Sequence, residues 1–280
     1  MQRSALLTRE RRPLRSWQAK WMGRGIRTFV KPLAARIPFT PQVMKLSQLG
    51  FDIATLVLPV HSQVHIAPGR LGGVPGEWLK AGKNVLANRV LLYLHGGGYF
   101  FGSPRSHRSV TWRLSRDCHA KVFALDYRQP PDWGYPAPLE DAMAAYRALL
   151  DEGYLPENII FAGDSAGGNL TLATLLKIRE TGLPMPACAV LISPWCDLTC
   201  SGDSVTYNAK KEHMIPVNAL RVISKSYAGH RSAKDPLISP VFADFSGFPP
   251  LLIQVGDGEV LYSDAERVAE GAQNAGVPCR

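Results

Sequence analysis

Residues 159–170 read Ile-Ile-Phe-Ala-Gly-Asp-Ser-Ala-Gly-Gly-Asn-Leu. The apolar run that begins at Ile159 is typical of a buried strand, and the residues from Asn169 onward predict a helix. Between them the pattern G-x-S-x-G predicts a sharp turn that lifts the hydroxyl of Ser165 above the end of the strand. Glycines on both sides of the serine relieve crowding around a strained backbone. Ser165 is therefore a candidate nucleophile, and a surface loop with a serine between glycines is the alternative.

The chain around this stretch alternates between apolar runs and helix-like segments. Strand-like runs span residues 90–94, 121–125, 158–162, 187–192 and 251–255, and helix-like segments span 139–150, 169–180 and 264–274. Strands that are apolar throughout and alternate with helices indicate a mainly parallel sheet covered on both faces. Upstream, residues 53–66 look β-like, and the Gly/Pro-rich segment 68–76 predicts a hairpin or surface loop.

Composition restricts the class of protein. A chain of 280 residues with 46% apolar residues can bury a sizeable core, as one α/β domain with or without a small cap. No apolar run reaches the roughly 18 residues that cross a bilayer. The five cysteines are scattered and odd in number, which suits reduced thiols and a cytoplasmic location. Cys196 and Cys200 have no histidine at metal-site spacing, so we expect no metal.

The positive charge is concentrated at the N-terminus. Residues 1–36 contain ten lysines and arginines against Glu10 alone, so this segment accounts for the whole net charge of +9. Apolar residues from Trp17 to Leu33 follow a loosely helical spacing. We expect an amphipathic helix whose apolar side packs on the body while its basic face is solvated. Contact with an acidic membrane surface or a polyanion is the alternative.

These patterns divide the chain into two regions. Residues 1–50 form a basic helical cap region, and residues 51–280 form the catalytic domain. Within that domain the segment at about 198–248 fits the strand–helix alternation poorly, so we expect it to form a lid over the sheet.

A second stretch supplies candidate oxyanion donors. His95-Gly96-Gly97-Gly98-Tyr99 follows a predicted strand directly, and consecutive glycines let backbone N–H groups turn toward a ligand. We assign the N–H groups of Gly97 and Gly98 to an oxyanion hole, together with that of Ala166. His95 is expected to be structural. A phosphate-binding loop is the competing interpretation, but the sequence has no G-x-x-x-x-G-K-[ST] pattern.

A third stretch, residues 255–265, supplies the acid expected after the serine. Asp257, Glu259 and Asp264 compete for this role. Asp264 begins a predicted helix, so N-capping explains it more simply, and Asp257 suits a turn.

The sequence offers no clear general base. No histidine follows the candidate acids, and a base would be expected on the order of thirty residues beyond them, one strand–helix unit on. The sequence ends at Arg280. We therefore expect the last strand and helix of the fold, and the catalytic histidine, to be missing and the activity to be impaired. Substitution by His213 or His230 from the lid is a minor alternative.

Together the motifs resemble the hormone-sensitive-lipase-like family of α/β-hydrolase esterases. The matching stretches are 95–99, 126–128, 135–137, 140–142, 163–170, 193–195, 197–199 and 255–256 with Glu259. The resemblance implies an α/β-hydrolase fold with an N-terminal helical cap, hydrolysis of short to medium acyl esters and no cofactor. Aligned with the Asp-Pro-Leu-x-Asp motif of the family, Glu259 is preferred over Asp257 as the acid, and Asp197 ranks third.

We therefore predict a serine carboxylic-ester hydrolase that works through an acyl-enzyme at Ser165. The alternative is a noncatalytic scaffold of the same fold that binds an apolar ligand or a protein. The expected partner is a small ester, with no nucleic acid. Weak membrane contact through the basic arm and a homodimer are further options.

Overall fold

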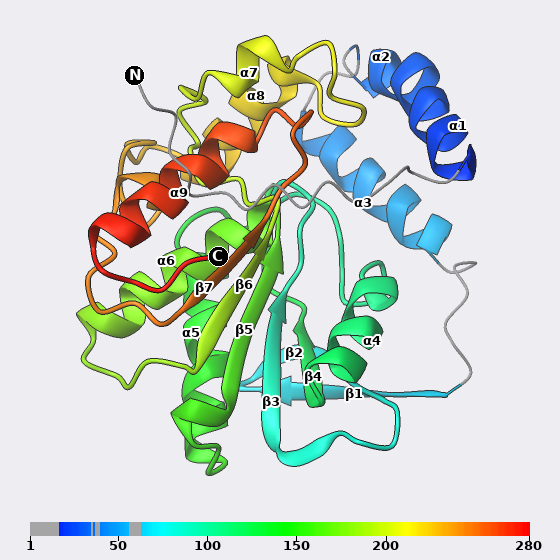
Figure 1. The fold of residues 1–280 in the computed structure, drawn as a ribbon. Helices are drawn as coiled ribbons and strands as arrows, with labels where there is room; N and C mark the ends of the chain where they lie inside the picture. Colours follow the sequence, from blue (N-terminus) through cyan, green and yellow to red (C-terminus); the bar gives the residue numbers. More distant parts are fainter. Residues whose placement is uncertain (1–16, 35, 37–39, 56–62) are drawn as a thin grey trace.

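In the described part of the chain, seven strands form one mixed sheet in the order β1-β2-β4-β3-β5-β6-β7 (Figure 1). The structure, a computed structural model, describes residues 17–34, 36, 40–55 and 63–280. From β4 across to β7 all neighbours run parallel, whereas the β1–β2 and β2–β4 pairs are antiparallel. The strands are β1 (Val64–Leu71), β2 (Val74–Ala81), β3 (Leu86–Leu94), β4 (Ala120–Leu125), β5 (Ile159–Asp164), β6 (Cys188–Ile192) and β7 (Leu251–Gln254). The predicted mainly parallel sheet is confirmed.

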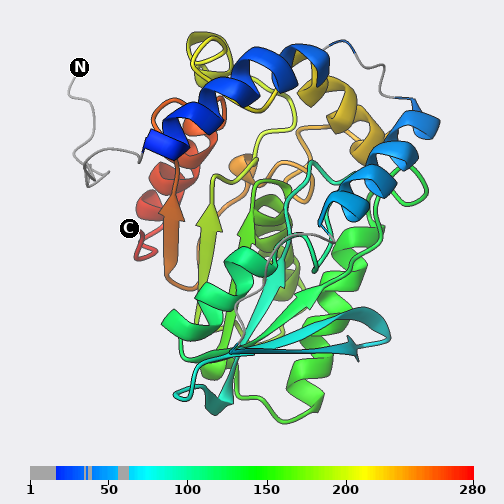
Figure 2. The same cartoon turned by 90° about the vertical axis from the view of Figure 1, so that its right-hand side faces the viewer.

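Helices cover both faces of the sheet and its carboxyl end (Figures 1 and 2). The helices of the sheet layers are α4 (Arg108–Asp117), α5 (Ala137–Asp151), α6 (Ala166–Glu180) and α9 (Tyr262–Asn274). Those over the carboxyl end are α1 (Trp17–Gly25), the π-helical turn η1 (Ile26–Val30), α2 (Lys31–Ala34), α3 (Pro41–Thr55), α7 (Ser204–Tyr207) and α8 (Val217–Ala228). Short 3₁₀ turns are η2 (Pro156–Asn158) and η3 (Pro240–Phe242).

The core follows the period of two along each strand. In β3, Val90, Leu92 and Leu94 belong to the cluster beneath α5 and α6, whereas Leu91 and Tyr93 belong to the cluster beneath α4. Successive side chains of a strand point to opposite faces. A strand that is apolar throughout therefore needs helices on both sides, which is what the alternation of the sequence predicts.

The β-like interpretation of residues 53–66 is wrong at its start. Residues 53–55 are the last turn of α3, residues 56–62 lie outside the described part of the chain, and β1 begins at Val64. The predicted hairpin is confirmed, with its turn at Gly72 and Gly73. Pro68 lies within β1, at the edge of the sheet, where the missing N–H costs no ladder bond.

The segment between β6 and β7 packs against the cap helices. Lys31 Nζ donates hydrogen bonds to the carbonyl oxygens of Ala209 and Glu212, both at 2.8 Å. The ring of His213 packs against α1, where a Cβ added at Gly23 would be 3.2 Å from its Cδ2 atom. The segment that carries α7 and α8 and the helices α1–α3 thus lie together over the carboxyl end of the sheet (Figure 1).

The last residues of the described chain pair with β7. Leu251 N–H donates to the carbonyl of Pro278 at 2.9 Å, and Ile253 N–H donates to that of Arg280 at 2.8 Å. The bridge between Leu251 and Cys279 is parallel. The approach to a further strand, predicted at residues 276–278, is therefore present.

Two smaller findings concern membrane-spanning helices and the cysteines. Among the helices in the described ranges, none is long and apolar enough to cross a membrane. All five cysteines are free thiols.

Asp264 is buried at the start of α9, but its carboxylate does not cap that helix. Its Oδ2 accepts hydrogen bonds from the backbone N–H groups of Cys196 and Asp197, both at 2.8 Å. The N-capping interpretation is therefore wrong: Asp264 joins α9 to the loop after β6. Burial, with the nearby charge of Asp197, raises the pKa of Asp264 to about 7, although the two N–H donors oppose the effect.

This raised pKa predicts a pH-dependent stability. The unfolded chain releases the proton of Asp264 near its ordinary pKa of about 3.9, whereas the folded chain holds it to about pH 7. The contribution is full below about pH 4 and is lost as the pH rises through about 7. We expect Asp264→Asn to remove this pH-dependent loss of stability, which is worth at most about 4 kcal/mol. The measurement is the free energy of unfolding in urea at about pH 5 and at about pH 8. Asp264→Ala should cost about 2–5 kcal/mol at both pH values, because two buried N–H groups lose their acceptor. An unchanged pH profile in Asp264→Asn contradicts the assignment.

Candidate active site

Ser165 stands in a strained turn between β5 and α6. Its backbone has φ 50° and ψ −117°, a conformation that non-glycine residues seldom adopt. Its N–H donates to the carbonyl of Ile192 at 2.9 Å, and its carbonyl accepts from the N–H groups of Asn169 and Trp195 at 3.1 and 3.0 Å. These bonds hold the strained residue in place, with its side chain partly exposed at the N-terminus of α6. The predicted strand, sharp turn and helix are confirmed.

The glycine loop after β3 contains two glycines with positive φ. Gly97 has φ 117° and Gly98 has φ 61°. Within the described residues neither N–H donates a hydrogen bond. A Cβ at Gly97 would lie 1.9 Å from the carbonyl oxygen of Phe101, so only glycine fits there. The N–H of Ala166, in the first turn of α6, likewise has no acceptor within its own helix.

The elbow and the glycine loop touch through their backbones. A Cβ at Gly167 would lie 1.9 Å from the carbonyl oxygen of Leu94 and 2.6 Å from that of His95. The first turn of α6 therefore packs directly on the end of β3. This contact brings the candidate donors Gly97, Gly98 and Ala166 onto adjacent segments beside Ser165.

Asp164, the residue before Ser165, connects the elbow to the glycine loop through hydrogen bonds. Its Oδ1 accepts hydrogen bonds from Tyr93 Oη at 2.6 Å and from the N–H of Gly96 at 2.8 Å, and its Oδ2 lies 3.5 Å from His107 Nε2. Burial by itself raises the pKa of this carboxyl, but the donors, His107 first, outweigh it and hold the pKa below its ordinary value. Asp164 is therefore an ionised anchor for the glycine loop.

His95 is structural, as expected. Its ring stacks on Tyr127 with centroids 4.3 Å apart, and its Nδ1 lies 2.8 Å from the carbonyl oxygen of Gly96, which can only accept. Complete burial, with the neighbouring charge of His107, lowers its pKa to about 3. A general base needs a pKa nearer the working pH, so the ring of His95 serves to position the loop.

Several supporting residues were not singled out in the sequence. Tyr99 Oη donates to Asn169 Oδ1 at 2.7 Å, and Asn169 Nδ2 donates to the carbonyls of Trp195 and Ile238 at 2.8 and 3.0 Å. The signal for Asn169, as for Asp164, was its place inside the nucleophile stretch. His107 had no such signal, because only the fold brings α4 near Asp164.

The candidate acids occupy different environments. Glu259 follows β7, and its Oε1 accepts the N–H of Gly256 at 2.8 Å. Asp257 is exposed. Asp197 is buried and bound by its own loop, and it pairs with Arg267 at 2.7 Å. Asn208 Nδ2 donates to the carbonyls of Asp257 and Glu259 at 3.0 and 2.8 Å, so the segment between β6 and β7 holds the acid loop.

No histidine in the described residues hydrogen-bonds to Ser165. His213 packs against α1 and His230 is exposed after α8. His61 lies outside the described residues. The minor alternative of a base from the lid therefore has no supporting contact.

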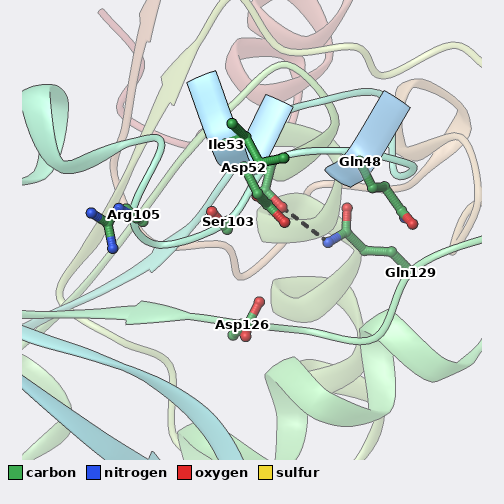
Figure 3. Close-up of a pocket in the computed structure, with 8 residues that line it drawn as sticks. Gln48, Asp52, Ile53, Ser103, Arg105, Asp126 and Gln129 are labelled. Carbon is green, nitrogen blue, oxygen red and sulfur yellow. Dashed lines mark hydrogen bonds between the residues drawn. The ribbon is translucent and has the colours of Figure 1, made fainter. Parts of the chain in front are cut away.

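A polar pocket of about 340 Å³ opens beside the glycine loop (Figure 3). Ser165 does not line it. Asp126 enters it from the end of β4, Gln129 from the following loop and Asp52 from α3, and Gln129 Nε2 donates to the carbonyl of Gly102 at 3.3 Å. Desolvation, with the charges of Asp52 and Glu77, raises the pKa of Asp126 to about 6.

Known proteins resemble this chain in sequence and in structure. Residues 91–280 match a family model described as the alpha/beta hydrolase fold. An acetyl-hydrolase of Streptomyces hygroscopicus is 44% identical over 220 residues, which cover 75% of this chain and 73% of that protein. The structure of an esterase from the bacterial hormone-sensitive lipase family has a TM-score of 0.85 and 37% identity, and the match covers 92% of this chain and 86% of that one. A structure of EstE5 soaked with p-nitrophenyl butyrate has a TM-score of 0.86 and 37% identity, covering 93% of this chain and 85% of that one.

The close contact at Gly167 predicts a sharp effect of one methyl group. We expect Gly167→Ala to lower any ester hydrolysis by at least about 100-fold, because displacing one oxyanion donor costs that much. Gly50→Ala is the control, since Gly50 is an exposed helical residue with no atom within 4 Å of an added Cβ. It should keep full activity and gain a little stability. Equal activity in the two folded variants, measured with a chromogenic ester, contradicts the proposed contact.

The pair of His107 and Asp164 predicts a pH dependence of stability. Burial lowers the pKa of His107, but the hydrogen bond to Asp164 outweighs it and leaves the pKa raised. The stabilisation is therefore full below about pH 6.5 and is lost as the pH rises through the folded pKa. We expect His107→Gln to lower the free energy of unfolding by about 1–3 kcal/mol near pH 6. The difference should shrink as the pH rises through the folded pKa of His107, above which the imidazole is neutral, as the glutamine side chain is. A difference that is constant with pH contradicts a charged His107.

Proposed function

We propose that this chain, which belongs to the hormone-sensitive-lipase-like family of α/β-hydrolases, hydrolyses carboxylic esters at Ser165. One observation carries the proposal. Ser165 is held in a strained turn at the N-terminus of α6, beside a glycine loop whose two N–H groups have no partner in the described residues. A serine hydroxyl next to unused backbone donors is the arrangement that acyl transfer requires.

The reaction follows from these positions. Ser165 Oγ attacks the ester carbonyl carbon and loses its proton to a base, and the carbonyl oxygen becomes an oxyanion. The N–H groups of Gly97, Gly98 and Ala166 stabilise that oxyanion, aided by the positive end of the α6 dipole. The carbon–oxygen bond to the alcohol breaks, and the alcohol leaves with the proton. Water then attacks the acyl group on Ser165 and releases the carboxylic acid.

Glu259 is our candidate for the acid that orients the base. It follows β7, and its loop is held by Gly256 and Asn208. We propose that the base is not among the described histidines, so the 280-residue chain hydrolyses esters weakly at best. Loss of a triad member costs about 10⁴-fold to 10⁶-fold in rate.

The substrate class we propose is esters of short to medium acyl chains. The support is indirect: one relative is named an acetyl-hydrolase, and EstE5 was soaked with p-nitrophenyl butyrate. A second candidate is a noncatalytic scaffold that binds an apolar ligand or a protein through the same site, because no histidine in the described residues contacts Ser165.

The test compares two chain lengths. We expect p-nitrophenyl butyrate to be hydrolysed at least about 1,000-fold faster by a chain extended to the next stop codon than by the 280-residue chain. In both, Ser165→Ala should remove the turnover that exceeds buffer. If the extended chain shows no Ser165-dependent turnover, the scaffold is the better description. Full turnover by the 280-residue chain contradicts the claim about the base.

A further inference from the structure

The helical cap exposes large apolar side chains on its outer side. Trp17, Trp21 and Phe29 have 69%, 66% and 75% of their surface exposed. Single exposed apolar residues are common, but here three exposed aromatic side chains lie within 13 residues of sequence. The expectation that the apolar side of this helix packs on the body is therefore wrong for these three residues.

Basic side chains are exposed in the same segment. Trp17, Trp21 and Arg24 follow the helical spacing i, i+4 and i+7 within α1, which places them on one face. The guanidinium of Arg24 lies 5.9 Å from the centre of the Trp21 ring. Arg27 is exposed as well, and within the described ranges neither arginine forms an ion pair. We call Trp17, Trp21, Arg24, Arg27 and Phe29 the cap face.

A second apolar stripe lies on α3. Leu46, Leu49 and Ile53 are 69%, 57% and 56% exposed and follow the spacing i, i+3 and i+7. Both α1 and α3 lie on the side of the molecule that is turned toward the viewer in Figure 2. Ile53 also lines the polar pocket beside the glycine loop, so this stripe reaches the mouth of that pocket (Figure 3).

The charge of the cap indicates what covers these residues. From residue 17 to residue 55 the sequence has six lysines and arginines against Asp52 alone. Lys31 is occupied by two carbonyls and Lys45 pairs with Asp132 at 2.8 Å, whereas Arg24, Arg27 and Arg36 are exposed. A second copy of this chain placed on the same face would bring basic side chains together. A negatively charged surface is complementary.

We propose that the cap face docks on an anionic lipid surface. A helix that presents tryptophan and phenylalanine between arginines lies in the interface, with its rings at the headgroup level and its guanidinium groups against lipid phosphates. The α3 stripe then meets the same surface. Docking is peripheral and does not depend on the catalytic chemistry proposed above.

The test is flotation of the 280-residue chain with vesicles. We expect binding to vesicles of phosphatidylglycerol mixed with phosphatidylcholine, and at least about tenfold weaker binding to phosphatidylcholine alone. Binding should weaken when the salt rises from about 50 to about 500 mM. Trp17→Ser with Trp21→Ser, and separately Arg24→Glu with Arg27→Glu, should each lower binding to the anionic vesicles at least about tenfold.

Matched controls lie at the other end of the molecule. Lys80→Glu with Lys83→Glu makes the same change of charge at exposed residues of β2 and the following turn, and Leu155→Ser removes an exposed apolar side chain before β5. Both should bind like the parent. All variants change surface residues, so an unchanged melting temperature verifies folding. The proposal is overturned if the parent does not bind anionic vesicles, or if the cap-face variants bind as the parent does. It is also overturned if sedimentation shows a dimer that depends on Trp17 and Trp21 without vesicle binding.

Discussion

The backbone contact between Gly167 and the carbonyl of Leu94 is the constraint on which the site depends. Parallel pairing sets Leu94 level with Gly163, so the glycine loop and the elbow leave the sheet side by side. Any side chain at Gly167 would separate them. The strained backbone of Ser165 costs about 1–3 kcal/mol, and hydrogen bonds to β6 and to the loop after it offset this cost. The candidate nucleophile and the candidate oxyanion donors are thus positioned by the sheet register.

A buried charge strengthens the same contact. Asp164 precedes the serine and accepts from Tyr93, Gly96 and His107, which come from β3, the glycine loop and the start of α4. An ionised carboxylate with several donors is stable where an unpaired one is not. Because a donor on the glycine loop and a donor on α4 meet on one side chain, neither segment can shift without breaking a charge-assisted bond.

The sequence predicted the parts of the fold that depend on local pattern. Apolar runs predicted five of the strands. The glycines around Ser165 and in residues 96–98 predicted the position of the candidate active site. Helix α4 was missed because its residues 108–117 are mostly polar: Val110 and Leu114 are its apolar side chains in the sheet cluster, and the other residues buried there, Thr111 and Ser115, are polar. The roles of His107, Glu212 and Asp264 could not be predicted from the sequence. Each residue acts through a contact with a residue about 50 to 70 positions away, and these contacts exist only in the fold.

The segment between β6 and β7 joins the cap to the loop of Glu259. Glu212 is buried there: its Oε2 accepts the N–H of Val260 at 3.1 Å, while its backbone carbonyl accepts Lys31 Nζ. Glu212 therefore binds the cap through its backbone carbonyl and holds the loop after β7 through its side chain. Since Lys31 turns inward while Trp17, Trp21 and Phe29 are exposed, a surface that covers these rings leaves the bonds at Glu212 intact. Docking as proposed would therefore require no rearrangement of the loop that carries Glu259.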